Sequence, residues 1–586
     1  MDLAYTCAYE AIPFIKFGSL AESQKRAGVQ LGETYLNDRG VKDFTMTLGD
    51  EMEDQLKQQL LQTDFITVLV DGSTDCAVLE KELFYVRFVD CAGCVSTKLL
   101  ALKNAESADA EGLLKALTKS FTDIGLDNFT EHLIGFMSDG ASVNFGKKAC
   151  LLTKLRHEMP WLIGIHCLNH RLELAIKDAF KGTVFDEICT LLSNIHAVFE
   201  RSSKRLRALH ALGEVMEEDC KKPARTNGTR WIQHKLQAAS ILLKQYGLIV
   251  LCLTSITDDS KVSGYVKRMK LFKTVTHLQL FVDLLSPIGR LSEHLQGETT
   301  NLLLAQSALE STLLTLKRTN GAVYSEPLTK LVEDAKAEIA KHNAEKHRHA
   351  LDHDGDLGDD SDTHSDNQME IEFQSIGITN LKQGLSSLEK SSLAITSKLS
   401  DCISQRFHDV LSHSESGSPN PVIAAVKILD IKAWPQNRSE LHTFGESELS
   451  LVTAHFEKVL AGKVDCAEVS GEWLCLKLYV ADNLQHLQSE ECWSVLSKSK
   501  GKAFTNVMTI INMLRIFPVS NAIVERCFST MTKVKTDWRN RLGEKEVEHL
   551  IRIKKEGPVP GTSGGKLLIE SAVDRFFQSK IRRGDK

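Results

Sequence analysis

The strongest constraint on this chain is the order of apolar patterns between residues 65 and 180. Residues 65–75 form a short β-branched run, and residues 82–90 alternate apolar and polar side chains as a half-buried strand does. The segments that follow predict a further strand at 96–104, a helix at 110–125, a strand at 132–140, a helix at 144–157, a strand at 162–167 and a helix at 169–180. The order is therefore β-β-β-α-β-α-β-α.

This order favours an α/β fold in which a mixed sheet carries packed helices. From about residue 235 to 510 the strand pattern largely disappears and apolar residues recur at helical spacing. Residues 351–370 hold eight acidic residues and no Lys or Arg, which predicts a solvated, disordered acidic loop over 341–372. Residues 557–565 are rich in Gly and Pro and predict a linker before a short basic tail.

Composition narrows the class of protein further. The 586 residues are 42% hydrophobic and 25% charged, with a net charge of −6, which is typical of folded globular chains. No apolar run approaches the roughly 18–20 residues that span a bilayer, so we expect no membrane partner. The 14 cysteines are scattered and suggest a reducing compartment rather than a disulfide framework.

Two aspartates follow two of the predicted strands. Asp71 and Asp139 each precede a glycine at the point where a strand ends. Carboxylates at adjacent strand ends can bind a hard divalent cation, and with a third carboxylate they could hold two metals for phosphoryl transfer. The alternative is that each Asp-Gly pair is a plain turn.

Three other motifs admit both a functional and a structural interpretation. Cys167 and His170 have the C-x-x-H spacing of zinc ligands, or they belong to a packed helix N-terminus. Cys91 and Cys94 could bind zinc or act in redox chemistry, or form a hairpin turn. Residues 201–230 hold eight Lys or Arg and four Asp or Glu before Trp231, which suits either a nucleic-acid strand or a solvated helix with a core Trp.

Residues 517–553 form the last notable segment. Ser520 can cap a helix, and apolar side chains follow it in two stripes. From the pattern alone this is an amphipathic helix pair that packs within the chain or across a dimer.

Together these stretches resemble the hAT (hobo–Activator) superfamily of transposases, in the vertebrate type associated with zinc fingers. The matching blocks, in chain order, are DGSTD, MSDGAS, HCLNHRLELA, TRW and SNAIVERCFSTMTKVKTDWRNRL. The last block resembles the hAT C-terminal dimerisation region and is the most specific signal.

The resemblance implies a ribonuclease-H-like mixed-sheet core interrupted by a large all-α insertion domain. It implies a DDE triad of Asp71, Asp139 and Glu525 that binds two Mg²⁺ or Mn²⁺ ions in an active enzyme. Cys167 and His170 match the motif beside the active site. Arg230 and Trp231 match the DNA-binding motif whose Trp stacks on a flipped base. The dimerisation residues would be Phe528, Leu542, Val547 and Leu550.

The domain organisation expected from the resemblance has five parts. They are a helical N-terminal region at 1–60, the first part of the core at 61–234, the helical insertion with its acidic loop at 235–505, the dimerisation region completing the core at 506–556, and a flexible basic tail at 557–586.

The chain departs from the family pattern in one respect. Family members usually begin with a zinc-binding DNA-recognition module, whereas Cys7 is the only cysteine here before Cys76, so we expect no zinc finger in this chain.

The first hypothesis on function is a dimerising nuclear DNA-binding protein, derived from a transposase and no longer transposing. The alternative is an active metal-dependent DDE transposase or nuclease. A third interpretation is a helical scaffold that shares only ancestry. The expected partners are a second copy of the chain and DNA, with no small-molecule substrate.

Overall fold

The computed structural model describes residues 1–584 apart from 75–79, 105–106, 108, 147–148, 227–230, 298–299, 319–323, 353–368, 412–419, 500–502 and 536–541. The chain divides into two compact units. The sheet unit comprises Met1–His170, Gln296–Ala305 and Pro419–Lys586. The helical unit comprises Arg171–Leu295 and Gln306–Ser418.

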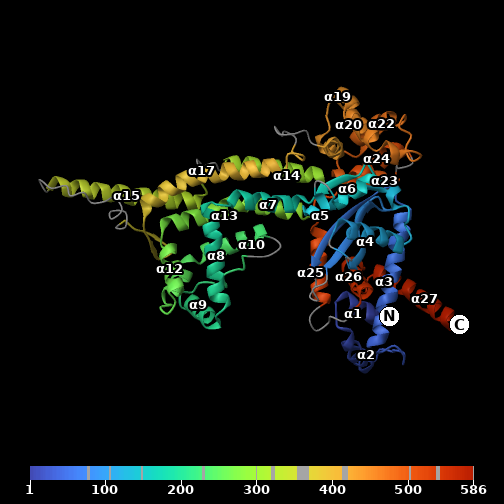
Figure 1. Ribbon diagram of the computed structural model, residues 1–586, viewed down its shortest axis with the longest axis horizontal. Coiled ribbons are helices and arrows are strands. Elements are labelled where there is room, and N and C mark those ends of the chain that lie inside the picture. Colours follow the sequence, from blue (N-terminus) through green and yellow to red (C-terminus); the bar gives the residue numbers. More distant parts are fainter. Residues whose placement is uncertain are drawn as a thin grey trace. The chain divides into compact units, whose positions relative to one another are not determined.

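The sheet unit is built on a five-stranded mixed sheet with the order β3-β2-β1-β4-β5 (Figure 1). The strands are β1 (Ile66–Thr74), β2 (Glu80–Val89), β3 (Val95–Asn104), β4 (Leu133–Ser138) and β5 (Ile163–His166). The first three are antiparallel neighbours, and β4 and β5 run parallel to β1. The predicted mixed sheet is therefore confirmed.

One face of the sheet is covered by helices that connect the strands. They are α4 (Ala110–Asp123), α5 (Ser142–Phe145) and α6 (Leu151–Glu158), with η2 (Phe129–Glu131) beside them. After β5 the chain enters α7 (Leu168–Phe180), most of which belongs to the helical unit. Asp109 caps α4 by accepting a hydrogen bond from the Gly112 amide at 2.8 Å. The helix predicted over 144–157 is thus two helices, and the predicted element order is confirmed.

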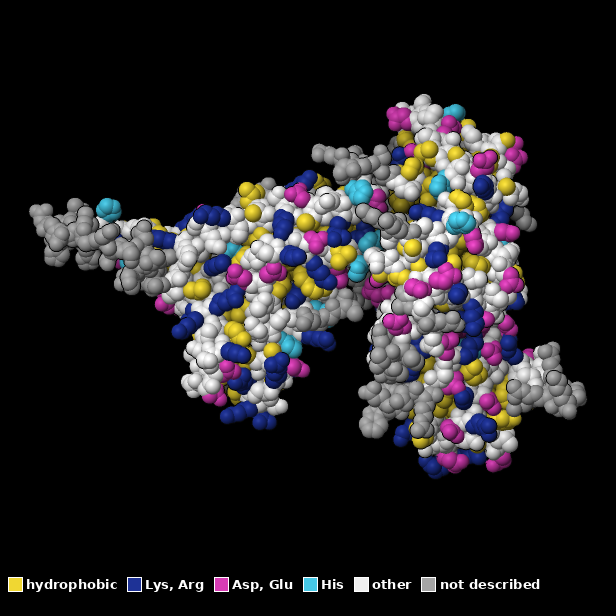
Figure 2. All heavy atoms as spheres, viewed as in Figure 1, with side chains coloured by type: hydrophobic (Ala, Val, Ile, Leu, Met, Phe, Trp, Pro, Cys, Tyr) yellow, Lys and Arg dark blue, Asp and Glu magenta, His cyan; other side chains and the backbone are white. Residues whose placement is uncertain are grey.

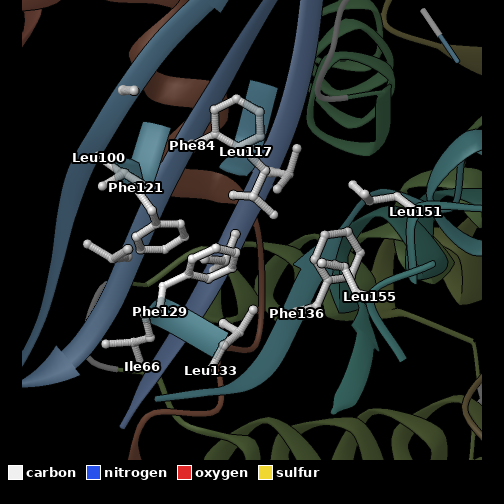
Figure 3. Packing of buried hydrophobic residues seen from close by; sticks show 14 of the residues in the cluster. Ile66, Phe84, Leu100, Leu117, Phe121, Phe129, Leu133, Phe136, Leu151 and Leu155 are labelled. Atoms are coloured by element: carbon white, nitrogen blue, oxygen red, sulfur yellow. The ribbon is translucent and has the colours of Figure 1, made fainter. Parts of the chain in front are cut away.

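The core of this unit lies between the sheet and these helices. Alternate residues of β1 and β2 point into it, among them Val68, Val70, Phe84 and Val86, all fully buried. Figure 3 shows Phe121 and Phe129 side by side over the strands, and their rings stack with centroids 4.4 Å apart.

The opposite face of the sheet carries elements from both ends of the chain. α25 (Ala522–Val534) packs on β1 and β2, and α26 (Glu544–Glu556) packs on β3. Beside them lie α1 (Asp2–Tyr9), η1 (Phe14–Lys16), α2 (Phe17–Arg26) and α3 (Asp38–Leu61). Residues some 500 positions apart in sequence therefore share one core, which includes Tyr5, Leu48 and Leu550.

The expected flexible tail at 557–586 is not what the structure shows. Residues Ser563–Gly584 form helix α27, which packs against α3. Leu568, Ala572 and Phe576 recur every four residues and are buried, so the segment presents an apolar stripe to the unit. The ring of Phe576 also meets Phe44, with centroids 5.1 Å apart.

Residues 421–515 add a further helical layer to the sheet unit. Its elements are α18 (Pro421–Ala425), η3 (Val426–Leu429), η4 (Ile431–Ala433), α19 (Arg438–Thr443), α20 (Glu446–His455), α21 (Glu457–Leu460), α22 (Val469–Asn483), α23 (Ser489–Ser499) and α24 (Thr505–Arg515). Three buried tryptophans, Trp434, Trp473 and Trp493, form its centre. Each indole N–H donates to a backbone carbonyl, which satisfies the polar atom of a buried ring.

The helical unit is arranged around α13 (Phe272–Leu295), which packs against α10 and α17 (Figure 1). Its other elements are α8 (Val184–Glu200), α9 (Ser203–Val215), α10 (Trp231–Lys244), α11 (Tyr246–Thr254), α12 (Ser260–Met269), α14 (Leu302–Arg318), α15 (Glu326–Asp352), β6 (Ile371–Phe373), β7 (Ile376–Ile378) and α17 (Leu381–Arg406). Part of the expected acidic loop at 341–372 is regular structure, because α15 continues to Asp352 and β6 begins at Ile371. Residues 353–368 lie outside the described part of the chain.

The two units differ in extent from the domains expected from sequence. Residues 171–234 cluster with the helical unit, and residues 419–505 cluster with the sheet unit. Periodicity cannot assign a helix to one unit or another, since buried helices of both units show the same spacing. In the described part of the chain no single helix is long and apolar enough to span a bilayer, and only the bent pair α10–α11 passes that test jointly.

Candidate active site

Asp71 and Asp139 lie at the same edge of the sheet. β1 and β4 are parallel neighbours, and Leu69 of β1 is paired with Met137 of β4. Each aspartate lies two residues beyond this pair, toward the carboxyl ends of adjacent strands. Asp139 directly follows β4, whereas Asp71 lies within β1, which continues to Thr74 and so does not end where the sequence predicted. This edge is where open α/β sheets commonly place their sites.

Glu525 joins this edge from the far end of the chain. It lies in the first turn of α25, the helix that packs on β1 and β2. Asn521 fixes the start of α25, because its side-chain amide donates to the Val70 carbonyl at 2.9 Å and its backbone N–H donates to Cys167 Sγ at 3.2 Å. Val70 directly precedes Asp71, and Glu525 lies one turn of helix beyond Asn521.

The electrostatics show that the carboxylates influence one another. Burial, followed by the negative charges of Asp139, Glu525 and Glu82, raises the pKa of Asp71 to about 8. The structure therefore brings together the three carboxylates that the resemblance implied. Among the described residues, the ligand oxygens of these three carboxylates do not all lie within 4.8 Å of one another.

Glu82 is a fourth carboxylate at this edge, and sequence reasoning missed it. It lies opposite Gly72 in the β1–β2 pair, and a Cβ atom on Gly72 would approach its Oε1 to 2.6 Å. Burial and the charges of Glu80 and Asp139 raise the pKa of Glu82 to about 7. The missing side chain at Gly72 thus leaves space for this carboxylate, a relation that depends on strand register and is not visible in the sequence.

Asp139 is held by its own loop. Its Oδ1 accepts hydrogen bonds from the Ala141 backbone at 3.2 Å and from Asn144 Nδ2 at 3.0 Å. Asn144 also donates to Ser138 Oγ at 2.7 Å, which fixes the amide. One aspartate oxygen is therefore oriented by the turn, as the turn interpretation of this Asp-Gly pair predicts. The donor set of the site is made of carboxylate oxygens, which Mg²⁺ and Mn²⁺ prefer.

Cys167 and His170 lie beside the site in a structural setting. Cys167 is buried, and its thiol accepts backbone hydrogen bonds at the start of α7 and from Asn521. Burial raises the pKa of this thiol to about 12, which disfavours the thiolate that binds zinc. The His170 ring lies 5.8 Å from the ring of His166. The arrangement matches the packed helix N-terminus that was the alternative interpretation.

Cys91 and Cys94 occupy the hairpin turn between β2 and β3. Both are exposed, and the turn is closed by the Asp90 N–H donating to the Cys94 carbonyl at 2.8 Å. Gly93 adopts φ 75°, which favours glycine. The motif therefore serves as a turn.

Trp231 begins helix α10 in the helical unit. Its backbone N–H donates to Glu173 at 3.1 Å, and its half-buried ring lies near Phe180 and Lys235. The other residue expected to bind DNA, Arg230, lies outside the described residues.

The four residues expected in a dimer interface differ in exposure. Val547 and Leu550 are buried in the sheet unit's own core, where α26 meets α1 and α3. Their apolar surface is therefore already covered within one chain. Phe528 and Leu542 are only half-buried.

A basic hollow lies on the helical unit. Its volume is about 790 Å³, and α8, α9, α11 and α12 contribute to its wall. The charged side chains that line it are Arg201, Lys204, Arg205, Lys261, Asp258 and Asp259. Figure 2 shows Lys and Arg side chains spread over this part of the unit's surface. The basic stretch noted in the sequence therefore reaches the surface.

A second group of ligand-type side chains joins α3 to α26. His549 Nε2 lies 3.6 Å from Asp50 Oδ1 and 3.4 Å from Glu53 Oε2. Of the described residues, only these three have ligand atoms that all lie within 4.8 Å of one another. Lys545 forms an ion pair with Glu53, so the group also functions as a network of ion pairs. The helical spacing of Asp50 and Glu53 is visible in the sequence, but nothing there connects them to His549.

The five-stranded mixed sheet and its helices form an α/β core. A comparison with known protein families finds an RNase-like match in this part of the chain. The family model described as "ZMYM1/FAM200, RNase-like domain" matches residues 33–147. The matched segment contains α3, β1 to β4 and both aspartates of the candidate site.

Proposed function

We propose that this chain is a DNA-binding protein derived from a hAT transposase, and that its sheet unit binds divalent cations through Asp71, Asp139 and Glu525. The observation that carries the proposal is the convergence of these carboxylates from two parallel strand ends and the first turn of α25. The negative charges of Asp139, Glu525 and Glu82 all act to raise the pKa of Asp71. A divalent ion would remove their mutual repulsion.

The protein's contribution to the site is orientation. Asn144 and the Ala141 amide hold Asp139, and Asn521 holds the start of the helix that carries Glu525. Divalent ions bound here would supply Lewis-acid activation of water and stabilisation of the leaving oxygen in phosphoryl transfer. The surrounding hydrogen bonds would keep the carboxylates in place with little rearrangement.

The second candidate function is DNA strand cleavage by a working DDE site. It is favoured by the retention of all three carboxylates at one edge of the sheet. The test measures Mn²⁺-dependent nicking of linear and hairpin DNA by the wild type, by Glu525→Gln and by a control at an exposed glutamate, Glu457→Gln. Nicking that disappears only in Glu525→Gln supports cleavage. Metal binding without nicking restricts the function to DNA binding.

DNA contact is proposed for the basic surface of the helical unit. Arg201, Lys204 and Lys261 line its hollow, and cationic side chains bind the phosphate backbone independently of sequence. Arg230 and Trp231 are the further candidates, by their resemblance to the family motif. The expected result is binding that weakens steeply with salt and is reduced in the double variant Lys204→Gln, Lys261→Gln. Equal binding by the variant and the wild type would reject this surface.

Self-association and a nuclear location complete the proposal. Because Val547 and Leu550 are already covered within the chain, the proposed dimer contact uses the half-buried Phe528 and Leu542. Sedimentation velocity of the wild type and of Phe528→Ser tests it. A wild type that remains monomeric at micromolar concentration contradicts the contact.

A further inference from the structure

A small cavity lies in the sheet unit beside the start of α25. Its volume is about 270 Å³, and residues of β1, β2 and β3, the residues Gln296, Gly297 and Thr300, and residues near the start of α25 contribute to its lining. The ionisable residues of the lining are Arg87, Lys98 and Arg526, and Lys98 is paired with Val86, whose side chain faces the core on the other side of the sheet. No acidic side chain lines it among the residues that the structure describes. The cavity is therefore cationic, although the whole chain has a net charge of −6.

Arg87 is the most informative of these side chains. Its Nη1 donates to Thr97 Oγ1 at 3.1 Å, while its Nε is buried and has no hydrogen-bond partner. Burial is the main cause that lowers its pKa to about 10. The acid that acts on it, Glu490, already accepts a hydrogen bond from Arg515 at 3.2 Å. A buried guanidinium with an unused donor is unfavourable unless an anion approaches it.

The rest of the lining also suits an anion. The hydroxyls of Thr97 and Ser520 belong to it. Ser520, Ala522 and Ile523, at the entry to α25, form part of the wall, and the N-terminus of a helix favours negative charge. Arg526, the third cation, donates to the Gln296 carbonyl at 3.2 Å.

We propose that this cavity binds a phosphate group, with Arg87 as its principal cationic contact. Guanidinium groups bind phosphate oxygens through paired N–H donors, which matches the unused donor of Arg87. The phosphate is either a free anion or a phosphodiester of a nucleic-acid strand. The second source rests on the proposed function, whereas phosphate binding itself does not.

The first experiment titrates inorganic phosphate into the metal-free full chain at constant ionic strength and measures its dissociation constant by calorimetry. The test variant is Arg87→Met, and the matched control is Arg156→Met. Arg156 also has a lowered pKa, but it donates to the Leu162 carbonyl at 2.9 Å and lies outside this cavity. We expect Arg87→Met to weaken phosphate binding about tenfold or more, and the control to leave it unchanged.

A second variant, Arg526→Met, covers the case in which Arg87→Met does not fold, and a weaker affinity is expected there too. Equal phosphate affinity in the wild type and in the folded cavity variants would overturn the proposal, as would the absence of phosphate binding by the wild type.

The second experiment identifies the source of the phosphate. A single-stranded oligonucleotide that competes with inorganic phosphate in the wild type supports the phosphodiester source. Phosphate binding without such competition overturns that source and leaves a site for a free anion. Glu525→Gln should retain phosphate affinity even if it abolishes nicking, so failure of the proposed cleavage and failure of this site give different results.

Discussion

At the scale of single residues, the candidate site combines carboxylates that repel one another. Asp71 is affected by Asp139, Glu525 and Glu82, which come from three further segments of the chain. Local sequence indicates Asp71 and Asp139 as strand-ending residues, and it leaves a plain turn as the alternative. Glu525 comes only from the family resemblance. Glu82 could not be predicted, because its place depends on the pairing of β1 with β2 and on the small size of Gly72.

Asp71→Asn should stabilise the metal-free protein. Because the pKa of Asp71 rises from 3.8 to about 8, the native state holds a proton that the unfolded chain releases, so this group's contribution to stability falls as pH increases across that window. Removing the charge should raise the free energy of unfolding at pH 8 by roughly 1–2 kcal/mol. Urea denaturation of the wild type and the variant at pH 8 measures this change in the free energy of unfolding. The exposed control Asp127→Asn should change stability by less than about 0.5 kcal/mol. A loss of stability in Asp71→Asn would show that the native fold needs this carboxylate ionised.

Asn521→Ala should affect stability and metal affinity together. The variant removes the hydrogen bond from Asn521 to the Val70 carbonyl, which ties the start of α25 to β1. We expect a loss of roughly 1–3 kcal/mol in stability and a weaker affinity for Mn²⁺, because Glu525 would be less well held. Asn437→Ala is the control, since it removes an N-terminal cap elsewhere in the sheet unit. If both variants bind Mn²⁺ as the wild type does, Asn521 has only a structural role.

At the scale of secondary-structure elements, the sheet and its connecting helices follow from the sequence. The order β-β-β-α-β-α-β-α is confirmed because alternation and helical spacing are local properties. The packing of α1, α3, α26 and α27 on one another is not local. Leu48, Leu550 and Ala572 share a core, and periodicity shows only that each helix has an apolar face. The same limit explains why α27 was expected to be a tail.

The ion pairs between α3 and α26 should make stability depend on acid pH. Burial alone would raise the pKa of Glu53, but hydrogen bonds from His549 and Lys545 dominate and lower it to about 2. The stability that this group contributes is present above its unfolded pKa of about 4.5 and is lost as pH falls toward 2. In Glu53→Gln, the free energy of unfolding should fall less between about pH 4.5 and 2 than in the wild type, by roughly 1–3 kcal/mol. Urea melts at several pH values check this, and unchanged curves would contradict the assignment.

At the scale of the whole molecule, two compact units alternate along the chain. All the carboxylates of the candidate site belong to the sheet unit, whereas Trp231 and the basic hollow belong to the helical unit. The sequence predicts a helical segment in the middle of the chain but not its limits at residues 171 and 418. These limits depend on which helices contact each other, and that information is not contained in helical periodicity.

A core variant of the helical unit should leave the carboxylate site intact. Leu278 is fully buried in α13, and Leu278→Ala should destabilise its unit by about 2–5 kcal/mol. The Mn²⁺ affinity of the folded protein should stay the same, because every carboxylate of the site lies in the other unit. Calorimetric melting and Mn²⁺ titration below the melting range test this together. Loss of Mn²⁺ affinity in the folded variant would show that the site depends on both units.

The central claim is that Asp71, Asp139 and Glu525 form one divalent-cation site. The most direct test is a Mn²⁺ titration by isothermal calorimetry on the wild type, Asp71→Asn, Asp139→Asn, Glu525→Gln and the control Glu457→Gln. Each of the three site variants should weaken Mn²⁺ binding at least about tenfold, and the control should match the wild type. Wild-type affinity in all three site variants, with binding lost instead in Glu53→Gln, would contradict the claim and move the metal site to α3 and α26.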